Sequence, residues 1–179
     1  MKKTITVFGS SIPRDGSIEY KEAYKLGASL ASCGFNLCTG GYQGIMDAVS
    51  KGARENGSEA IGITLSRRRS FISRYLTREE KCNTLFERIT RLIECGDGYV
   101  VLQGGTGTLL ELASIWEMMN KGIIPLKPAV CHSQMWSRVV DVMERQIVNE
   151  NRKTGLIKVI NSIEDITAYF INAFLVKKF

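Results

Sequence analysis

Short runs of β-branched and other apolar residues alternate with longer segments of helical periodicity along almost the whole chain. Each run is long enough for one buried strand. Each longer segment has apolar residues at helical spacing and ends at glycine or another turn residue. Such alternation is typical of repeated βα units, in which parallel strands form a central sheet and helices cover its faces. We therefore expect an α/β protein with a doubly wound, mostly parallel sheet and helices on both faces.

The predicted elements follow one another closely and leave little of the chain unassigned. Strands are expected at residues 5–8, 35–38, 60–65, 98–102, 128–131 and 157–160. Helices are expected at residues 17–32, 45–55, 84–95, 109–120, 133–149 and 162–176. The polar and basic segment 66–81 is compatible with a short strand or with a loop. Since no linker, repeat or low-complexity tract divides the 179 residues, we expect one three-layer, Rossmann-like domain spanning residues 1–179.

The charge of the chain favours anionic ligands. It carries 24 Lys and Arg against 18 Asp and Glu, a net charge of +6, which does not by itself identify the ligand. The densest basic cluster is Arg67–Arg69, followed by Arg74 and Arg78. This cluster fits a solvated loop, a substrate-facing lid or a nucleic-acid patch. Because neither interleaved aromatic residues nor a nucleic-acid motif accompanies it, we do not expect a nucleic-acid partner.

The cysteine and histidine content bears on the compartment and on metal binding. Five cysteines are scattered without a C-x-x-C pair, which is typical of reduced thiols in the cytoplasm. His132 is the single histidine of the sequence, so we predict no metal site. No stretch approaches the roughly 20 apolar residues of a membrane span, and the first apolar run is too short for a signal peptide. We expect a cytoplasmic protein without a membrane partner.

Two glycine-rich segments, Thr39–Gly44 and Gln103–Thr108, each lie between a predicted strand and the following helix. Glycine lets the backbone approach an anion closely, and the free N–H groups and dipole of a helix start favour phosphate. A tight turn is the alternative for either loop alone. No Gly-Lys-Ser/Thr follows, which argues against a P-loop. We predict a phosphate site at Gly104, Gly105, Thr106, Gly107 and Thr108, and further ligand contacts at Ser10, Ser11, Gly40, Gly41 and Gly44.

The second of these loops carries the motif of a known family. Residues 103–111 read QGGTGTLLE, and here the sequence resembles the Lonely Guy family, whose signature is Pro-Gly-Gly-x-Gly-Thr-x-x-Glu. A second family element, Met-His-x-Arg-Lys, corresponds to LFERI at residues 85–89, where Arg88 is retained. The segments VFGSS at residues 7–11 and TGGYQGIMDAV at residues 39–49 are also similar to the family. The order of elements matches over nearly the whole chain.

The resemblance implies a function and a catalytic pair. Family members are phosphoribohydrolases, which cleave the N-glycosidic bond of a nucleoside 5′-monophosphate and release free base and ribose 5-phosphate. AMP and cytokinin nucleotides are substrates, no organic cofactor is needed, and the enzymes are typically homodimers. The resemblance implies that Arg88 and Glu111 are catalytic, and Arg91 on the same helix is a further candidate contact. A carboxylate near the sugar would stabilise the positive charge that develops on the ribose.

Other interpretations of the same residues stay open at this point. Glu111 is also compatible with a purely structural role near the positive end of its helix, where a carboxylate stabilises the helix by about 0.3–1 kcal/mol. Arg88 and Arg91 are also compatible with a solvated surface. Gln103 replaces the family's proline, and Phe86 and Ile89 replace the histidine and lysine of the arginine element. Related proteins with such changes include carriers of a nucleotide-like cofactor. A binding protein without hydrolytic activity is therefore the alternative function, whereas no site for pyridoxal phosphate supports lysine decarboxylation.

Overall fold

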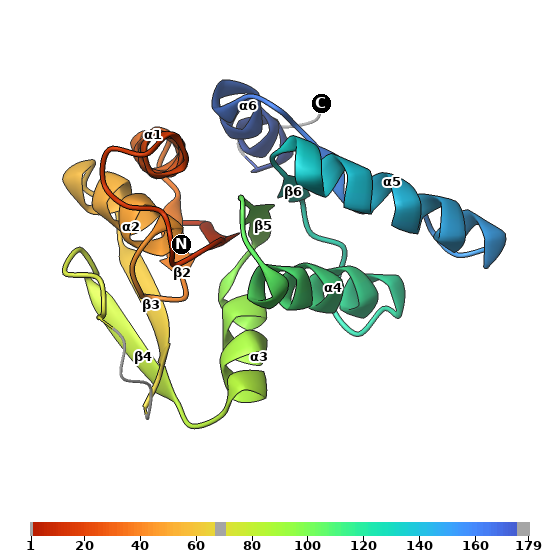
Figure 1. Cartoon of the computed structure of the whole chain (residues 1–179), viewed down its shortest axis with the longest axis horizontal. Helices are drawn as coiled ribbons and strands as arrows, with labels where there is room; N and C mark the ends of the chain where they lie inside the picture. Colours follow the sequence, from red (N-terminus) through yellow and green to blue (C-terminus); the bar gives the residue numbers. More distant parts are fainter. Residues whose placement is uncertain (1, 67–70, 175–179) are drawn as a thin grey trace.

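The computed structural model describes residues 2–66 and 71–174, and it confirms the α/β class. A seven-stranded sheet has the order β4-β3-β2-β1-β5-β6-β7, and each neighbouring pair is parallel (Figure 1). The strands are β1 (Thr4–Phe8), β2 (Asn36–Thr39), β3 (Ala60–Leu65), β4 (Arg78–Cys82), β5 (Gly98–Val101), β6 (Ala129–Cys131) and β7 (Lys158–Val159). The chain proceeds outward from β1 to β4 and returns beside β1 as β5. The sheet is therefore doubly wound, with its switch point between β1 and β5.

Helices cover both faces of the sheet. They are α1 (Ile18–Ser32), α2 (Ile45–Glu55), α3 (Leu85–Cys95), α4 (Thr106–Asn120), α5 (Gln134–Asn149) and α6 (Ile163–Phe174). Side chains of α1, α2 and α6 share one apolar core with the strands, and those of α3, α4 and α5 share the other. The alternation of side chains along β1 serves both cores, because Ile5 and Val7 belong to the first and Phe8 to the second. This is the three-layer arrangement expected from the sequence.

Helix boundaries follow local signals in the sequence, with one exception. The hydroxyls of Ser17 and Thr84 accept hydrogen bonds from N–H groups in the first turns of α1 and α3. Gly34, with a φ of 88°, follows α1 in the left-handed conformation that favours glycine. The exception is α4, which begins at Thr106 rather than at the predicted residue 109. Gly107 and the threonines beside it are weak helix formers, so composition hides this first turn.

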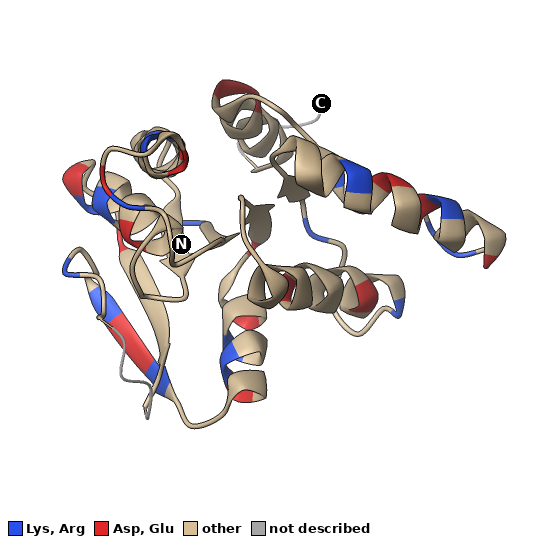
Figure 2. Cartoon of the chain, in the orientation of Figure 1, with Lys and Arg blue, Asp and Glu red and all other residues tan. Residues whose placement is uncertain are grey.

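The edge strand β4 resolves the ambiguity of the segment after β3. Its sequence REEKC is charged, as is usual for a strand at the edge of a sheet, and β4 is the outermost strand among the residues that the structure describes. These charges contrast with the uncharged central strands (Figure 2). The arginines at 67–69 lie outside the described residues, as do residues 175–179 with the predicted end of the last helix. Across the two described ranges, no helix is both long enough and apolar enough to cross a membrane.

Candidate functional site

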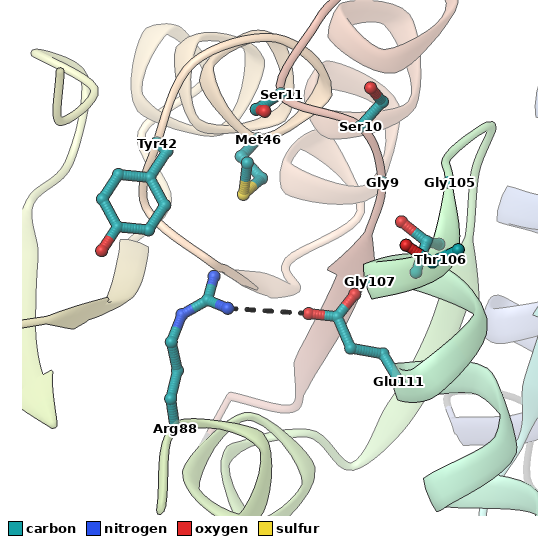
Figure 3. A pocket seen from close by; sticks show the side chains of 11 residues that line it. Gly9, Ser10, Ser11, Tyr42, Met46, Arg88, Gly105, Thr106, Gly107 and Glu111 are labelled. Carbon is teal, nitrogen blue, oxygen red and sulfur yellow. Dashed lines mark ion pairs between the residues drawn. The ribbon is translucent and has the colours of Figure 1, made fainter. Parts of the chain in front are cut away.

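A pocket of about 280 Å³ opens where three connections after parallel strands meet beside the switch point. They are the turn after β1, the glycine loop after β2 and the glycine loop after β5. These connections and the helix starts that follow them contribute Gly9–Ser11, Tyr42, Met46 and Gly105–Thr108. Arg88 from α3 and Glu111 from α4 complete the lining and point toward each other (Figure 3). Ligands of open α/β sheets bind at this position, because reversal of the strand order leaves a crevice there.

The first turn of α4 presents unpaired backbone donors. Leu109 donates the first backbone hydrogen bond of the helix, to the carbonyl oxygen of Gly105 at 3.0 Å. The preceding N–H groups of Thr106, Gly107 and Thr108 have no acceptor within the described part of the chain, and the N-cap Gly105 provides no side-chain cap. Because free N–H groups at a helix start attract anions, this turn suits the phosphate that the sequence predicts.

Arg88 is a buried cation held from several sides. Its Nε donates to the carbonyl oxygen of Ile63 at 2.7 Å, and its Nη2 donates to that of Gly40 at 3.1 Å. The guanidinium carbon lies 5.4 Å from the centre of the Tyr42 ring, which is a cation–π distance. Nη1 faces Glu111, with 3.8 Å between Nη1 and Oε1. Since the Arg88 side chain is 7% exposed, the interpretation of this residue as a solvated surface charge is wrong.

Glu111 is a carboxyl group in a poorly solvated position. Its side chain is 12% exposed, and it lies on α4 about one turn beyond the unpaired N–H groups. Burial raises the pKa of Glu111 to about 7, and the attraction of Arg88 offsets part of that rise. Protonated and ionised forms are therefore both populated near neutral pH. Such a group is suited to proton transfer, or to stabilising a positive charge on a bound sugar.

Three pocket residues, Gly9, Tyr42 and Met46, are not marked as ligand contacts by the sequence. Tyr42 is 2% exposed, its ring lies against the Arg88 guanidinium, and its hydroxyl accepts a hydrogen bond from the Leu65 N–H at 2.7 Å. Met46 lines the pocket from the first turn of α2. The one available signal is that Tyr42 lies within a glycine loop. Its contact with Arg88 depends on the sheet order, which local patterns do not reveal.

The turn after β1 is joined to the loop after β5. The N–H of Ser10 donates to the carbonyl oxygen of Gln103 at 2.9 Å, and both Ser10 and Ser11 line the pocket. Proline has the same carbonyl oxygen, so this link does not depend on the residue type at position 103. Phe86 is 73% exposed, Ile89 is buried in a core, and neither lines the pocket. The two departures in the arginine element therefore lie outside the pocket.

Four of the candidate glycines lie behind the pocket rather than on its surface. The backbone of Gly40 and Gly41 packs against Arg88 and β3, and Gly44 packs against the turn after β1. Gly104 lies against the Thr108 side chain. The structure thus places these glycines where they support the lining residues.

Arg91 also lies away from the pocket. It forms ion pairs with Glu80 at 2.9 Å and with Glu94 at 2.5 Å. Glu87, four residues before Arg91 on α3, instead accepts a hydrogen bond from the backbone N–H of Asn83 at 2.8 Å. Three residues of α-helix turn a side chain by about 60° relative to Arg88, which directs Arg91 toward β4.

Residues 2–165 match the model of the SLOG cluster4 family. A cytokinin riboside 5′-monophosphate phosphoribohydrolase of Mycobacterium marinum is 28% identical over 136 residues, which cover 70% of this chain and 71% of that protein. The match to the family model spans the loop after β5 and the helices that carry Arg88 and Glu111.

The fold recurs in solved structures of low sequence identity. The molybdenum cofactor binding protein of Rippkaea orientalis has a TM-score of 0.78 at 22% identity, covering 98% of this chain and 99% of that one. The molybdenum cofactor carrier protein of Chlamydomonas reinhardtii has a TM-score of 0.76 at 22% identity, covering 99% and 100%. At these identities the similarity shows the fold alone.

Proposed function

Because the chain belongs to the SLOG cluster4 family, we propose that it binds a nucleoside 5′-monophosphate in this pocket and hydrolyses its N-glycosidic bond. AMP or a cytokinin-like nucleotide is the substrate class, and free base and ribose 5-phosphate are the products. Family membership and the phosphoribohydrolase relative confirm the resemblance to the Lonely Guy family. The observation that carries the proposal is the buried Arg88–Glu111 pair beside the unpaired N–H groups of α4.

The proposal places the phosphate at the first turn of α4. There the N–H groups of Thr106, Gly107 and Thr108 donate to the phosphate oxygens, and the helix dipole favours the negative charge. Space for the ligand is available, because a Cβ added to Gly105 or Gly107 would meet no heavy atom within 4 Å beyond its chain neighbours. The phosphate can therefore approach these N–H groups without meeting a side chain.

With the phosphate on these N–H groups, Glu111 lies on the side of the ribose. Cleavage leaves the bonding electron pair on the base nitrogen and positive charge on the ribose, which the ionised carboxylate stabilises. The oxygen of a water molecule then bonds to C1′, and one of its protons ends on the base. Since burial raises the pKa of Glu111 to about 7, the ionised fraction and the activity are expected to rise with pH through neutrality.

Arg88 is assigned to orienting Glu111 rather than to gripping the phosphate. Its Nε donates to the carbonyl oxygen of Ile63 within β3, its Nη2 donates to that of Gly40 directly after β2, and Nη1 faces the carboxylate. A cation fixed in this way favours the ionised form of Glu111 without having to move.

The test is chromatography of free base after incubation with a panel of nucleoside monophosphates, combined with calorimetry of AMP binding. Glu111→Ala is expected to abolish base release while changing the AMP affinity by less than about threefold. Glu117→Ala is the matched control, because Glu117 lies on the same helix with its side chain 51% exposed. Equal loss of binding and turnover in Glu111→Ala would mean that Glu111 is structural and would overturn the proposal.

A carrier is the second candidate function. The two solved structures described above are named as molybdenum cofactor binding and carrier proteins, and Gln103 departs from the motif of the hydrolases. In a carrier, the same pocket holds a nucleotide-like ligand without cleaving it. Tight binding of nucleotides without base release from any monophosphate of the panel favours this function.

We also propose that two copies of the chain pair through α4 and α5. Leu109 and Leu110 of α4 and Val142 and Met143 of α5 are between 37% and 56% exposed, and a hollow of about 420 Å³ lies between the helices. Neighbouring exposed apolar side chains mark interaction surfaces, and the family resemblance implies a homodimer. Sedimentation velocity should show a dimer for the wild type and a monomer for Met143→Glu. A monomeric wild type contradicts the pairing.

A further inference from the structure

A second hollow, of about 570 Å³, lies beside the candidate site. Gly44 lines it and packs against the backbone of Ser10 and Ser11, which line the first pocket, so the two hollows share a wall. The other walls come from Pro13–Asp15, from the first turns of α1 and α2, and from the segment that ends at Tyr75. Volumes of about 300–1,000 Å³ are usual for small-molecule sites, so the hollow has the size of a binding site.

A buried carboxylate lines this second hollow. Asp47, in the first turn of α2, is 8% exposed, and its Oδ2 accepts a hydrogen bond from the Tyr20 hydroxyl at 2.6 Å. Asp47 makes no other side-chain hydrogen bond and no ion pair with the residues that the structure describes. A carboxylate offers about four acceptor positions. The oxygens of Asp47 are not among the fully buried unpaired atoms of the described residues, so the free positions are accessible from the hollow that Asp47 lines. Asp47 therefore has acceptor capacity to offer a ligand.

The two arginines that line the hollow donate hydrogen bonds to groups other than Asp47. Arg14 donates through Nη1 to the carbonyl oxygen of Ser11 at 3.3 Å, and Arg74 donates through Nη2 to the Tyr75 hydroxyl at 2.8 Å. The hollow thus holds two guanidinium groups beside the carboxylates of Asp15 and Asp47, and neither arginine forms an ion pair with Asp47 among the described residues. An anionic substituent on the ligand is therefore tolerated near these guanidinium groups.

An apolar wall completes the second hollow. Phe71 is 87% exposed and Ile72 is 43% exposed. Their backbone is nevertheless held, because Gln43 Nε2 donates to both carbonyl oxygens, at 3.4 and 3.3 Å, and Ser73 N–H donates to Gly41 O at 2.9 Å. Exposed apolar side chains on a hydrogen-bonded segment suit contact with a flat ring.

We propose that this second hollow is a binding site for a heterocyclic base with a ring N–H beside an amino group, the edge that guanine presents. The two donors match the carboxylate of Asp47, and the ring lies against Phe71, Ile72 or Tyr75. Adenine lacks the ring N–H and binds less well. The site goes beyond the proposed hydrolysis and does not depend on it.

The test uses guanosine, inosine and adenosine, which lack the phosphate that the first pocket is proposed to hold. By calorimetry, the wild type should bind guanosine about tenfold more tightly than inosine, which lacks the amino donor to a charged acceptor. Asp47→Asn should abolish this preference, since its amide oxygen still accepts from Tyr20 and preserves the contact between α1 and α2. Asp15→Asn, at the same hollow, is the matched control and should keep the preference.

A second variant separates recognition from folding. Tyr20→Phe removes the internal donor but keeps the carboxylate, so it should retain the preference for guanosine. Equal affinities of the wild type for the three nucleosides would overturn the inference, and so would a folded Asp47→Asn that still prefers guanosine. Base release from AMP in the same preparations is scored separately, so failure of the second site and failure of the proposed hydrolysis are distinguishable.

Discussion

The glycine loops after β2 and β5 occupy matching positions at the carboxyl edge of the sheet, yet they need their glycines for different reasons. In the loop after β2 the protein itself fills the space. A Cβ on Gly40 would lie 1.9 Å from Arg88 Nη2, and a Cβ on Gly44 would lie 2.5 Å from the carbonyl oxygen of Ser10. Gly44 also has a φ of 73°, which side chains disfavour. Internal packing and backbone conformation account for these glycines.

The loop after β5 contains glycines that the surrounding protein does not require. A Cβ on Gly105 or Gly107 would meet no heavy atom within 4 Å beyond its chain neighbours, and neither residue has a positive φ. Gly107 even weakens the first turn of α4, by about 1 kcal/mol relative to alanine. Open space beside unpaired N–H groups is what a ligand site needs. The same residue type therefore indicates packing in one loop and ligand access in the other.

The largest effect is expected in the loop after β2. Gly44→Ala should lower the free energy of unfolding by about 3 kcal/mol, because the new Cβ meets the backbone of Ser10 and Ser11 at a positive φ. Urea denaturation followed by circular dichroism measures this loss. A loss below about 1 kcal/mol would show that the loop tolerates a side chain, and the contrast between the loops would disappear.

The ion pair between Arg88 of α3 and Glu111 of α4 gives the next largest effect. Glu111→Gln should raise the free energy of unfolding by about 2 kcal/mol at pH 8 and leave it nearly unchanged at pH 4. The folded protein keeps Glu111 protonated up to a pKa of about 7, so the wild type loses stability as the pH rises from about 4.5 to about 7. Glutamine does not titrate. Urea denaturation at a series of pH values measures the difference, and a pH-independent difference would contradict the burial argument.

A smaller effect on stability, opposite in sign to that of Gly44→Ala, is expected in the loop after β5. Gly107→Ala should raise the free energy of unfolding by up to about 1 kcal/mol, because alanine is the better helix former. Its methyl group should also weaken AMP binding about tenfold by intruding on the phosphate. Urea denaturation and calorimetry on the same variant measure the two effects. Unchanged AMP affinity would show that the ligand does not use this space.

The smallest effect is expected for an arginine that lies away from both loops. Arg91→Ala should change the AMP affinity by less than about twofold and the free energy of unfolding by at most about 1 kcal/mol, because its ion pairs with Glu80 and Glu94 are solvated. Calorimetry and urea denaturation measure both quantities. A strong loss of AMP binding would bring Arg91 back into the site.

Most of the strands and helices can be predicted from the sequence, because the residues that begin and end each element are its neighbours along the chain. The cap at Ser17 and the glycine at position 34 bound α1 as the sequence indicates. The edge strand β4 has no apolar alternation to reveal it, since its charged side chains face solvent. The first turn of α4 is hidden because Gly107 lowers its helical propensity.

The site residues that belong to the family motif could be predicted from the sequence. The contacts that depend on the order of strands in the sheet could not. The motif brings Arg88 and Glu111 together, and the structure places them 3.8 Å apart. The contact between Tyr42 and Arg88 follows from the sheet order, which places the loop after β2 beside α3. Proximity along one helix misleads in the case of Arg91, because a small rotation carries its side chain out of the pocket.

The start of α4 at Thr106 determines the distance between the unpaired N–H groups of its first turn and Glu111. Glu111 is five residues further on (111 − 106), and at about 1.5 Å per residue this separation spans about 7.5 Å along the axis. Under the proposed function this length accommodates a pentose 5-phosphate, with its phosphate at the first turn of α4 and its anomeric carbon beside the carboxylate. Inserting one residue in this turn would rotate Glu111 about the helix axis by about 100°. The backbone geometry of α4, rather than contacts to the sugar, would therefore determine the length of sugar that the site accepts.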